Sequence, residues 1–140
     1  MRSRIVVDTS VLISALIGPQ GPSRESVRCC LLEECQPLMG NTLFCEYEAV
    51  VSREEIISQC PLTSLEISDL LAAFMSVCEW VQIYYLWRPN LRDEQDNHLI
   101  ELAIAGNARA IVTNNIRDFQ DAELIFPNLS ILQPEQLIRS

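Results

Sequence analysis

The sequence lacks lysine entirely and has one histidine, His98, among its 140 residues. Without lysine the chain cannot form a Walker-type phosphate loop, a Schiff-base enzyme or an acidic receiver site that is completed by lysine. A histidine-dependent triad would have to use His98, and no Gly-x-Ser-x-Gly elbow is present. These absences argue against nucleophilic catalysis by a side chain.

A Cys-x-x-Cys pair is also missing, although the chain has six cysteines, at positions 29, 30, 35, 45, 60 and 78. A single histidine completes no zinc pattern with them, and Cys29 and Cys30 fall inside a helical pattern. We therefore predict reduced, mostly buried thiols that act as core filler.

Long apolar runs are absent too. No segment approaches the roughly 20 apolar residues that a membrane-spanning helix needs. The early apolar run of Ile5, Val6 and Val7 is interrupted by Asp8, which does not suit a signal peptide. With 49% hydrophobic and 21% charged residues, the composition is that of a globular protein. We expect one domain, residues 1–140, in a soluble cytoplasmic protein with no membrane association.

Short β-branched runs alternate with longer helical patterns along the chain. Strands are predicted at 4–7, 36–39, 81–85, 109–113 and 129–132. Helices are predicted at 11–17, 23–34, 43–52 with a break or continuation near 53–58, 64–80, 94–105 and in a short segment from Pro134. Thr9 with Ser10, Asn41 with Thr42, and Thr63 or Ser64 are the expected N-terminal caps, and Glu66 is placed to close a capping box on Thr63. Gly106 and Asn107 should end the helix over 94–105.

This alternation predicts an α/β fold of three layers, with a central parallel sheet of about five short strands and helices on both faces. Ligands of such sheets bind beyond the carboxyl ends of the strands, at a topological switch point. The first and fourth strands are candidates for the neighbours that flank this point.

Polar residues follow both of these strands. Asp8 ends the first strand, where it could cap the next helix or serve a site, and the strand alone leaves these two readings open. Asn114, Asn115, Arg117 and Asp118 follow the fourth strand. Asparagine and aspartate are also ordinary turn residues there.

Asp96 gives the sharper signal. Asp93 suits the N-cap of the helix over 94–105, and Asp96 would then be a favourable first-turn charge. However, Leu99, Ile100 and Ala103 lie three, four and seven positions after Asp96, on one helical face with Ile104 close by. Burying a carboxylate on that face is unfavourable unless a cation or donor is present, so we favour a functional role for Asp96.

The helix over 43–52 carries two further acids. Glu46 and Glu48 flank its apolar face on opposite sides, and periodicity does not choose between them. Asp8, one of these two glutamates, Asp96 and Asp118 could converge at the carboxyl ends of the strands. Clustered carboxylates repel one another unless a cation joins them, and oxygen ligands suit Mg²⁺ or Mn²⁺, so the acids predict a metal site.

At this point the chain resembles the PIN-domain ribonucleases, especially the branch that supplies toxins of toxin–antitoxin pairs. The resemblance lies in IVVDTSVLISAL, FCEYEAVVSR, RDEQDNHLIELAIAGNARAIVTNNIRDF and FPNLSILQPEQLI. Each motif is short, but their order and spacing extend over most of the chain.

The resemblance assigns the acids of the family to Asp8, Glu46 and Asp96, with Asp93 as the preceding acidic position. Many relatives carry an aspartate two residues after the threonine of the fourth strand, where this chain has Asn115. Asp118 then stands as the fourth acid, and Asn115 could ligate through its carbonyl. The resemblance also implies that the hydroxyls of Thr9 or Ser10 and of Thr113 hold a metal-bound water or a phosphate.

The implied activity is metal-dependent hydrolysis of RNA by Mg²⁺ or Mn²⁺, with an antitoxin protein and a second copy of the chain as partners. A net charge of −9 gives no overall basic path for RNA, although Arg88, Arg92 and Arg117 could form a local phosphate clamp. The acidic surface would suit a basic partner. Two alternatives remain: a catalytically weak PIN-like binding module, and a phosphatase of the haloacid-dehalogenase kind, which the Asp8-Thr9-Ser10 sequence and the missing lysine disfavour.

Overall fold

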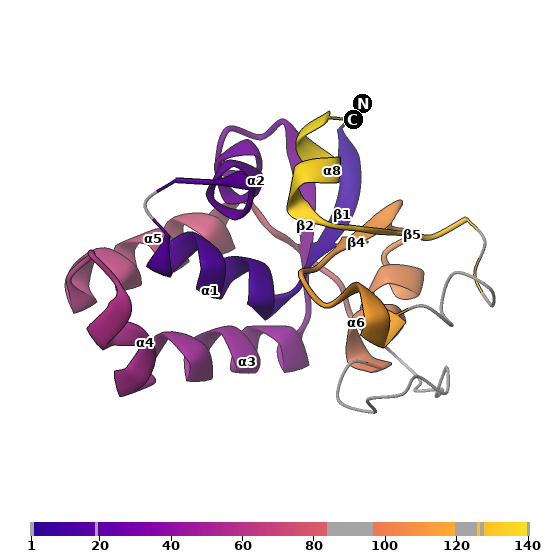
Figure 1. Cartoon of the computed structure of the whole chain (residues 1–140). Helices are drawn as coiled ribbons and strands as arrows, with labels where there is room; N and C mark the ends of the chain where they lie inside the picture. Colours follow the sequence, from indigo (N-terminus) through magenta and orange to yellow (C-terminus); the bar gives the residue numbers. More distant parts are fainter. Residues whose placement is uncertain (1, 19, 84–96, 120–125, 127, 140) are drawn as a thin grey trace.

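The computed structural model describes residues 2–18, 20–83, 97–119, 126 and 128–139 (Figure 1). The described residues form one parallel sheet from β1 (Ser3–Val7), β2 (Cys35–Met39), β3 (Glu79–Trp80), β4 (Ala110–Val112) and β5 (Ser130–Leu132). The strand order is β3-β2-β1-β4-β5. The predicted parallel sheet of five strands is confirmed, and β1 and β4 are neighbours, with Val7 opposite Val112.

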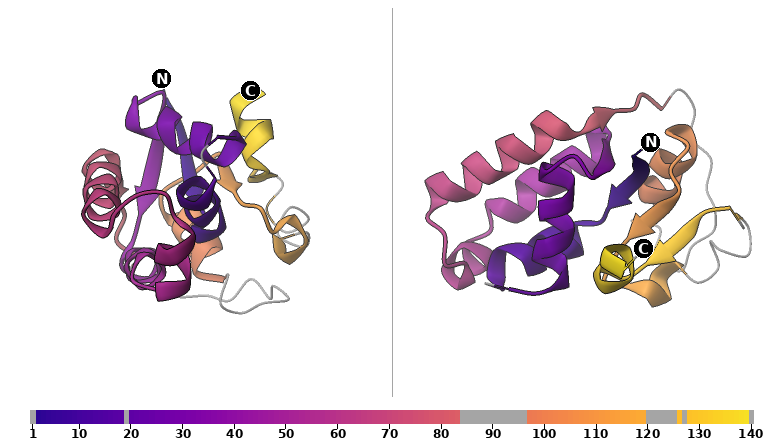
Figure 2. Two further views of the ribbon diagram at one scale, coloured as in Figure 1. Left: turned by 60° about the vertical axis from the view of Figure 1, so that its left-hand side comes forward. Right: turned by 90° about the horizontal axis from the view of Figure 1, so that it is seen from above.

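Helices cover both faces of this sheet. They are α1 (Thr9–Ile17), α2 (Pro22–Leu31), α3 (Asn41–Val51), α4 (Glu54–Gln59), α5 (Ser64–Val77), α6 (Asn97–Ala105) and α8 (Pro134–Arg139), with a short 3-10 turn η2 (Ile116–Phe119). Figures 1 and 2 show α1, α2 and α5 on one side of the strands and α6 on the other. Among the described helices, none combines the length and apolarity that crossing a membrane requires.

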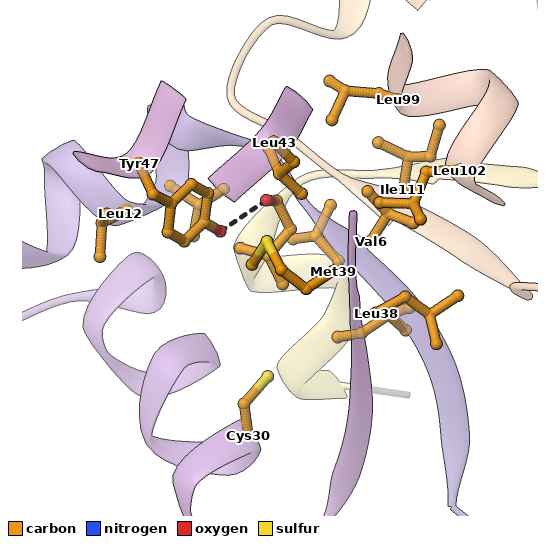
Figure 3. Packing of buried hydrophobic residues seen from close by; sticks show 14 of the residues in the cluster. Val6, Leu12, Cys30, Leu38, Met39, Leu43, Tyr47, Leu99, Leu102 and Ile111 are labelled. Atoms are coloured by element: carbon orange, nitrogen blue, oxygen red, sulfur yellow. Dashed lines mark hydrogen bonds between the residues drawn. The ribbon is translucent and has the colours of Figure 1, made fainter. Parts of the chain in front are cut away.

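The last three residues of β1 and all of β4 are apolar because both of their faces are covered. Ile5, Val6 and the β4 residues Ala110–Val112 are fully buried. Tyr47 of α3 is also fully buried, and its hydroxyl donates to the carbonyl oxygen of Val7 at 2.6 Å (Figure 3). Its ring stacks on Phe74 of α5 at 5.7 Å. This hydrogen bond fixes α3 beneath the end of β1, beside the switch point.

The two predicted ends of helices that depend on local chemistry are confirmed. The Thr63 hydroxyl accepts from the Glu66 backbone N–H at 3.1 Å, and the Glu66 carboxylate accepts from the Thr63 N–H at 3.0 Å. At the end of α6, Asn107 adopts a left-handed backbone with φ 56°. The adjacent Gly106 is packed so closely that a Cβ there would lie 2.5 Å from Leu38 Cδ1.

Other predicted boundaries were wrong. The helix α3 starts after Gly40 and has no side-chain cap, so Asn41 and Thr42 are exposed first-turn residues instead of caps. The third strand lies at Glu79–Trp80, earlier than the predicted 81–85, of which 84 and 85 lie outside the described residues. Pairing with β2 defines this position, since Leu38 lies opposite Glu79 and Met39 opposite Trp80. Arg4 of β1 also binds both carboxylate oxygens of Glu79, at 2.8 and 2.7 Å.

The cysteines are free thiols, as predicted, but the expectation that most are buried was wrong. Cys30 is buried, Cys45 is exposed, and the other four are half-buried. Desolvation raises the pKa of Cys29 to about 11 and that of Cys78 to about 12. Both groups therefore stay protonated near neutral pH and are weak nucleophiles.

Candidate functional site

Asp8 stands at the end of β1 and directly before α1. Its backbone N–H donates to the carbonyl of Val112 at 2.9 Å, so the residue still belongs to the edge between β1 and β4. Asp8 occupies the N-cap position of α1, but its side chain makes no capping hydrogen bond. Asp8 is also buried, with only 4% of its surface exposed. The capping explanation of this carboxylate is therefore excluded, and Thr9 and Ser10 are the first helical residues of α1 instead of its caps.

Three hydroxyl groups surround the Asp8 carboxylate. Thr113 Oγ1 and Ser10 Oγ donate to Asp8 Oδ2 at 2.7 and 3.0 Å. The Thr9 hydroxyl makes a long contact of 3.4 Å with Oδ1. The two oxygens of the carboxylate thus differ, because Oδ2 is held by two donors and Oδ1 has only the long contact among the described residues.

Backbone groups fix the direction of the two short hydrogen bonds. Ser10 Oγ accepts from the Asn114 N–H and Thr113 Oγ1 accepts from the Asn115 N–H, both at 3.0 Å. Since a hydroxyl has one proton to donate, these two hydroxyls are oriented to give it to Asp8. The carboxylate is therefore positioned by the turn after β4 as well as by α1.

The Asn114 side chain ties that turn to the helices. Its Nδ2 donates to the Ser10 carbonyl at 3.2 Å and to Ser14 Oγ at 3.1 Å, and lies 3.5 Å from Ser23 Oγ. Asn114, one of the polar residues noted after the fourth strand, is thus an anchor between the end of β4, α1 and α2. Asn115 extends its exposed side chain one residue further on.

Glu46 and Glu48 differ in their surroundings. Glu48 is exposed, whereas Glu46 is half-buried and its Oε1 lies 3.2 Å from Nε2 of His98 on α6. The two atoms are within ion-pair distance but are not aligned for a hydrogen bond. Glu46 is therefore the glutamate that faces α6, a choice that the helical period left open.

The charges of Asp8 and Glu46 both act on the buried Tyr47 hydroxyl. Desolvation raises the pKa of Tyr47 well above its usual value, nearby Cys78 and Cys30 raise it further, and the charges of Asp8 and Glu46 add in the same direction. Both carboxylates are thus near the buried phenol that joins α3 to β1.

The other predicted site residues are placed as follows. Asp118 is half-buried and Arg117 exposed, both in η2, and the Asp118 N–H donates to the Asn115 carbonyl at 3.1 Å. Asp93 and Asp96, with Arg88 and Arg92, lie outside the described residues. Within the described ranges, no three His, Cys, Asp or Glu side chains gather closely enough to hold a metal ion. The described acids alone do not form the predicted cluster.

The surroundings of Asp8 do fit a hard cation in their chemistry. The Asp8 carboxylate lies among the hydroxyl oxygens of Thr9, Ser10 and Thr113, and oxygen is the ligand atom that Mg²⁺ and Mn²⁺ prefer. The carboxylate is buried, and no arginine or histidine of the described chain pairs with it. A buried carboxylate without a cation is unfavourable, so the site is suited to a positive charge.

Two of the residues near this edge were missed from the sequence. His98, considered there only as a triad histidine, contacts Glu46, and Glu101 is 4% exposed although its side chain is a carboxyl group. The helix α6 buries Asn97 and Leu99–Ala103, while Ile104, expected near the inward stripe, is 41% exposed. An acid inside the run LIELAIA was the one signal that could have drawn attention to Glu101.

Taken together, the fold and Asp8 define a parallel α/β protein with an acidic, hydroxyl-lined site at its switch point. The PIN domain family model matches residues 4–117. The chain therefore belongs to the PIN domain family, whose members are generally nucleases that use divalent metal ions.

A solved structure supports the same fold. It is that of VapBC2 from Rickettsia felis bound to a DNA fragment from the promoter of the pair. The similarity covers 93% of this chain and 98% of that chain, with a TM-score of 0.62 and 18% sequence identity. No curated protein matches the chain.

Proposed function

We propose that this protein is a metal-dependent endoribonuclease and the toxin of a toxin–antitoxin pair. The observation that supports this most strongly is the buried Asp8 carboxylate, which is held by Ser10 and Thr113 and is left without a capping duty. Within the described residues, the Asp8 carboxylate neither caps a helix nor forms an ion pair that would offset the unfavourable energy of burying it. A cation-binding role explains the arrangement.

In this proposal, Asp8, Glu46, Asp96 and Asp118 hold Mg²⁺ or Mn²⁺, with the Asn115 carbonyl as a further ligand. The bound ion would supply hydroxide from water and neutralise charge on the scissile phosphate. Ser10 and Thr113 hold the Asp8 carboxylate in one orientation, and the Asn114 anchor prevents the turn after β4 from shifting. The exposed Arg117 contacts an RNA phosphate, and Thr9 and Asp93 are proposed to support the metal ligands or the substrate.

The partners follow from the fold and the charge. The similar structure is of a toxin–antitoxin complex on promoter DNA, and we propose a cognate antitoxin for this chain by analogy. A net charge of −9 favours a basic partner surface. We further propose a homodimer that acts on RNA in the cytoplasm.

The test is cleavage of a panel of structured and single-stranded RNAs with Mg²⁺, Mn²⁺ or EDTA. We expect cleavage with Mg²⁺ or Mn²⁺ and none in EDTA, and loss of cleavage in Asp8→Asn. Glu48→Gln is the matched control, since Glu48 is exposed on the same helix. Cleavage that persists in EDTA, or equal cleavage by Asp8→Asn and the wild type, would contradict the proposal.

A second candidate is a PIN-like binding module without catalysis. It is favoured by Asn115, which stands where many relatives carry an acid, and by the absence of a three-acid group in the described ranges. This candidate predicts that no RNA is cleaved with either metal, that Mn²⁺ leaves the melting temperature unchanged, and that Asp8→Asn stabilises the protein.

A further inference from the structure

A hollow lies at the same edge of the sheet as Asp8, beyond the ends of β2 and β3. It has a volume of about 500 Å³, within the roughly 300–1,000 Å³ of typical ligand pockets. Its walls are the first turn of α3, the segment 80–83 and α6. Its polar and aromatic lining residues include Asn41, Thr42, Trp80, Gln82, His98 and Glu101.

Trp80 provides an aromatic surface at this hollow. The residue is 49% exposed although it lies in a strand. The edge-to-face contact with Phe44, at 5.5 Å between ring centroids and 60° between planes, holds its indole ring. An exposed aromatic ring with a fixed orientation is the type of surface on which an unstacked base of single-stranded RNA packs.

The polar groups of the hollow suit the edge of a base. Asn41 and Gln82 each offer an amide that can donate and accept, and the Glu101 carboxylate accepts when it is ionised. A carboxylate prefers an edge that presents an amino group, and of the four RNA bases only uracil has no amino group. The lining therefore favours guanine, adenine or cytosine over uracil.

The hollow is connected to the candidate catalytic edge through His98. This residue lines the hollow, and its Nε2 lies 3.2 Å from Glu46 Oε1. Thr42, at the hollow, and Glu46 are four residues apart on α3, which corresponds to a rise of about 6 Å. One nucleotide can bridge such a separation, with its base in the hollow and its phosphate near Glu46.

We propose that this hollow binds one unstacked, amino-bearing base of the RNA substrate, next to the scissile phosphate. The inference rests on the proposed ribonuclease function, which it extends to a subsite for the base. Trp80 stacks on the base, and Asn41, Gln82 and Glu101 bind its edge.

The first experiment measures binding without catalysis. Fluorescence of Trp80 is recorded in the metal-free Trp87→Phe protein, where it is the only tryptophan, during titration with GMP or UMP. We expect saturable quenching, with GMP bound at least about fivefold more tightly than UMP. Glu101→Gln should narrow that difference. Absence of saturable quenching by GMP, or equal binding of the two nucleotides, overturns the inference.

The second experiment measures cleavage of RNA by variants of Trp80. Trp80→Ala should raise KM on the order of tenfold with little change in kcat, and Trp80→Phe should restore most of the loss. Leu65→Ala is the matched control, because Leu65 is an exposed apolar residue, 72% accessible, on α5. Equal KM values for Trp80→Ala and Leu65→Ala overturn the inference, even if the nucleotides quench fluorescence.

The two experiments separate this inference from the function on which it rests. If GMP quenches Trp80 as expected and no RNA is cleaved under any metal condition, the ribonuclease proposal fails, and with it the role of the hollow in cleavage. If RNA is cleaved and Trp80 neither binds GMP nor affects KM, the subsite alone fails.

Discussion

The starts of α1 and α5 look alike in the sequence and differ in the structure. Each helix is preceded by a residue with a short oxygen-bearing side chain, Asp8 or Thr63. Thr63 exchanges two hydrogen bonds with Glu66, which lies in the first turn of α5. Asp8 makes no such bond and instead accepts hydroxyl protons from Ser10 and Thr113.

The difference shows that a residue at a helix N-cap position can have a role other than capping that helix. The Thr63 side chain serves the helix that follows it, on an exposed part of the surface. The Asp8 side chain is buried at the sheet edge and is oriented by groups that come from β4. Stability should therefore depend on Thr63, and activity on Asp8.

The largest effect that separates the two positions is expected from Asp8→Asn. We expect a loss of RNA cleavage of more than about a hundredfold, since substitutions of groups that merely support a metal ligand already cost 10–100-fold. The melting temperature should not fall, because an amide accepts the same hydroxyl protons without a buried charge. Cleavage rate and thermal unfolding are measured together. If the variant unfolded at a lower temperature and retained activity, Asp8 would have a role in stability instead of in activity.

The glutamates of α3 offer a second, smaller contrast. Glu46→Gln should reduce cleavage about tenfold or more, because Glu46 faces α6 and is a proposed ligand. Glu48→Gln should leave cleavage unchanged, since Glu48 is exposed. Both variants are compared at a fixed Mn²⁺ concentration and in a Mn²⁺ titration. Loss of activity in Glu48→Gln would indicate that Glu48, on the opposite flank of α3, is the metal ligand.

Thr63→Ala is the stability counterpart of Asp8→Asn. It removes the hydroxyl that accepts from the Glu66 N–H, and we expect a decrease of about 1 kcal/mol in the free energy of unfolding. Urea denaturation measures this change. RNA cleavage at a temperature where both proteins are folded should be the same. A large change in cleavage would show that the two helix starts are not independent.

The smallest effect concerns pH. The Thr63 backbone N–H, followed by its hydroxyl, lowers the pKa of Glu66 below the ordinary value of a glutamate. A lowered folded-state pKa gives stabilisation that is complete above the ordinary pKa and is lost as the pH falls through the lowered value. The difference in melting temperature between wild type and Glu66→Gln should thus shrink between neutral pH and about pH 3. A constant difference would contradict the capping role of the charge.

Local features of the sequence predicted much of the fold. The apolar runs of β1 and β4 indicated buried parallel strands, and Thr63 with Glu66 indicated the start of α5, because these signals involve neighbours in the chain. The third strand was misplaced because its position depends on pairing with β2, a strand much earlier in the chain, with Leu38 opposite Glu79. The caps expected at Asn41 and Thr42 were wrong because the helix begins at Asn41, two residues before the predicted start, with Gly40 at the N-cap position.

The candidate site was predictable in part. Asp8 was singled out from its place at a strand end, but whether its side chain capped α1 was undecided until its hydrogen bonds were known. Glu46 and Glu48 were equivalent on a helical wheel, and the approach of His98 distinguishes them. Asp96 remains a prediction, because it lies outside the described residues.

The sequence by itself determined the alternation of strands and helices, the capping box of α5 and the exclusion of lysine-dependent chemistry, since these follow from residue type and short spacing. Tertiary structure decided what the carboxylates do. The Asp8 side chain is directed by Ser10 and by Thr113, 105 residues away, and the contacts of Glu46 depend on how α6 packs against α3. Hydrogen bonds between residues so distant in the chain leave no periodic pattern in the sequence.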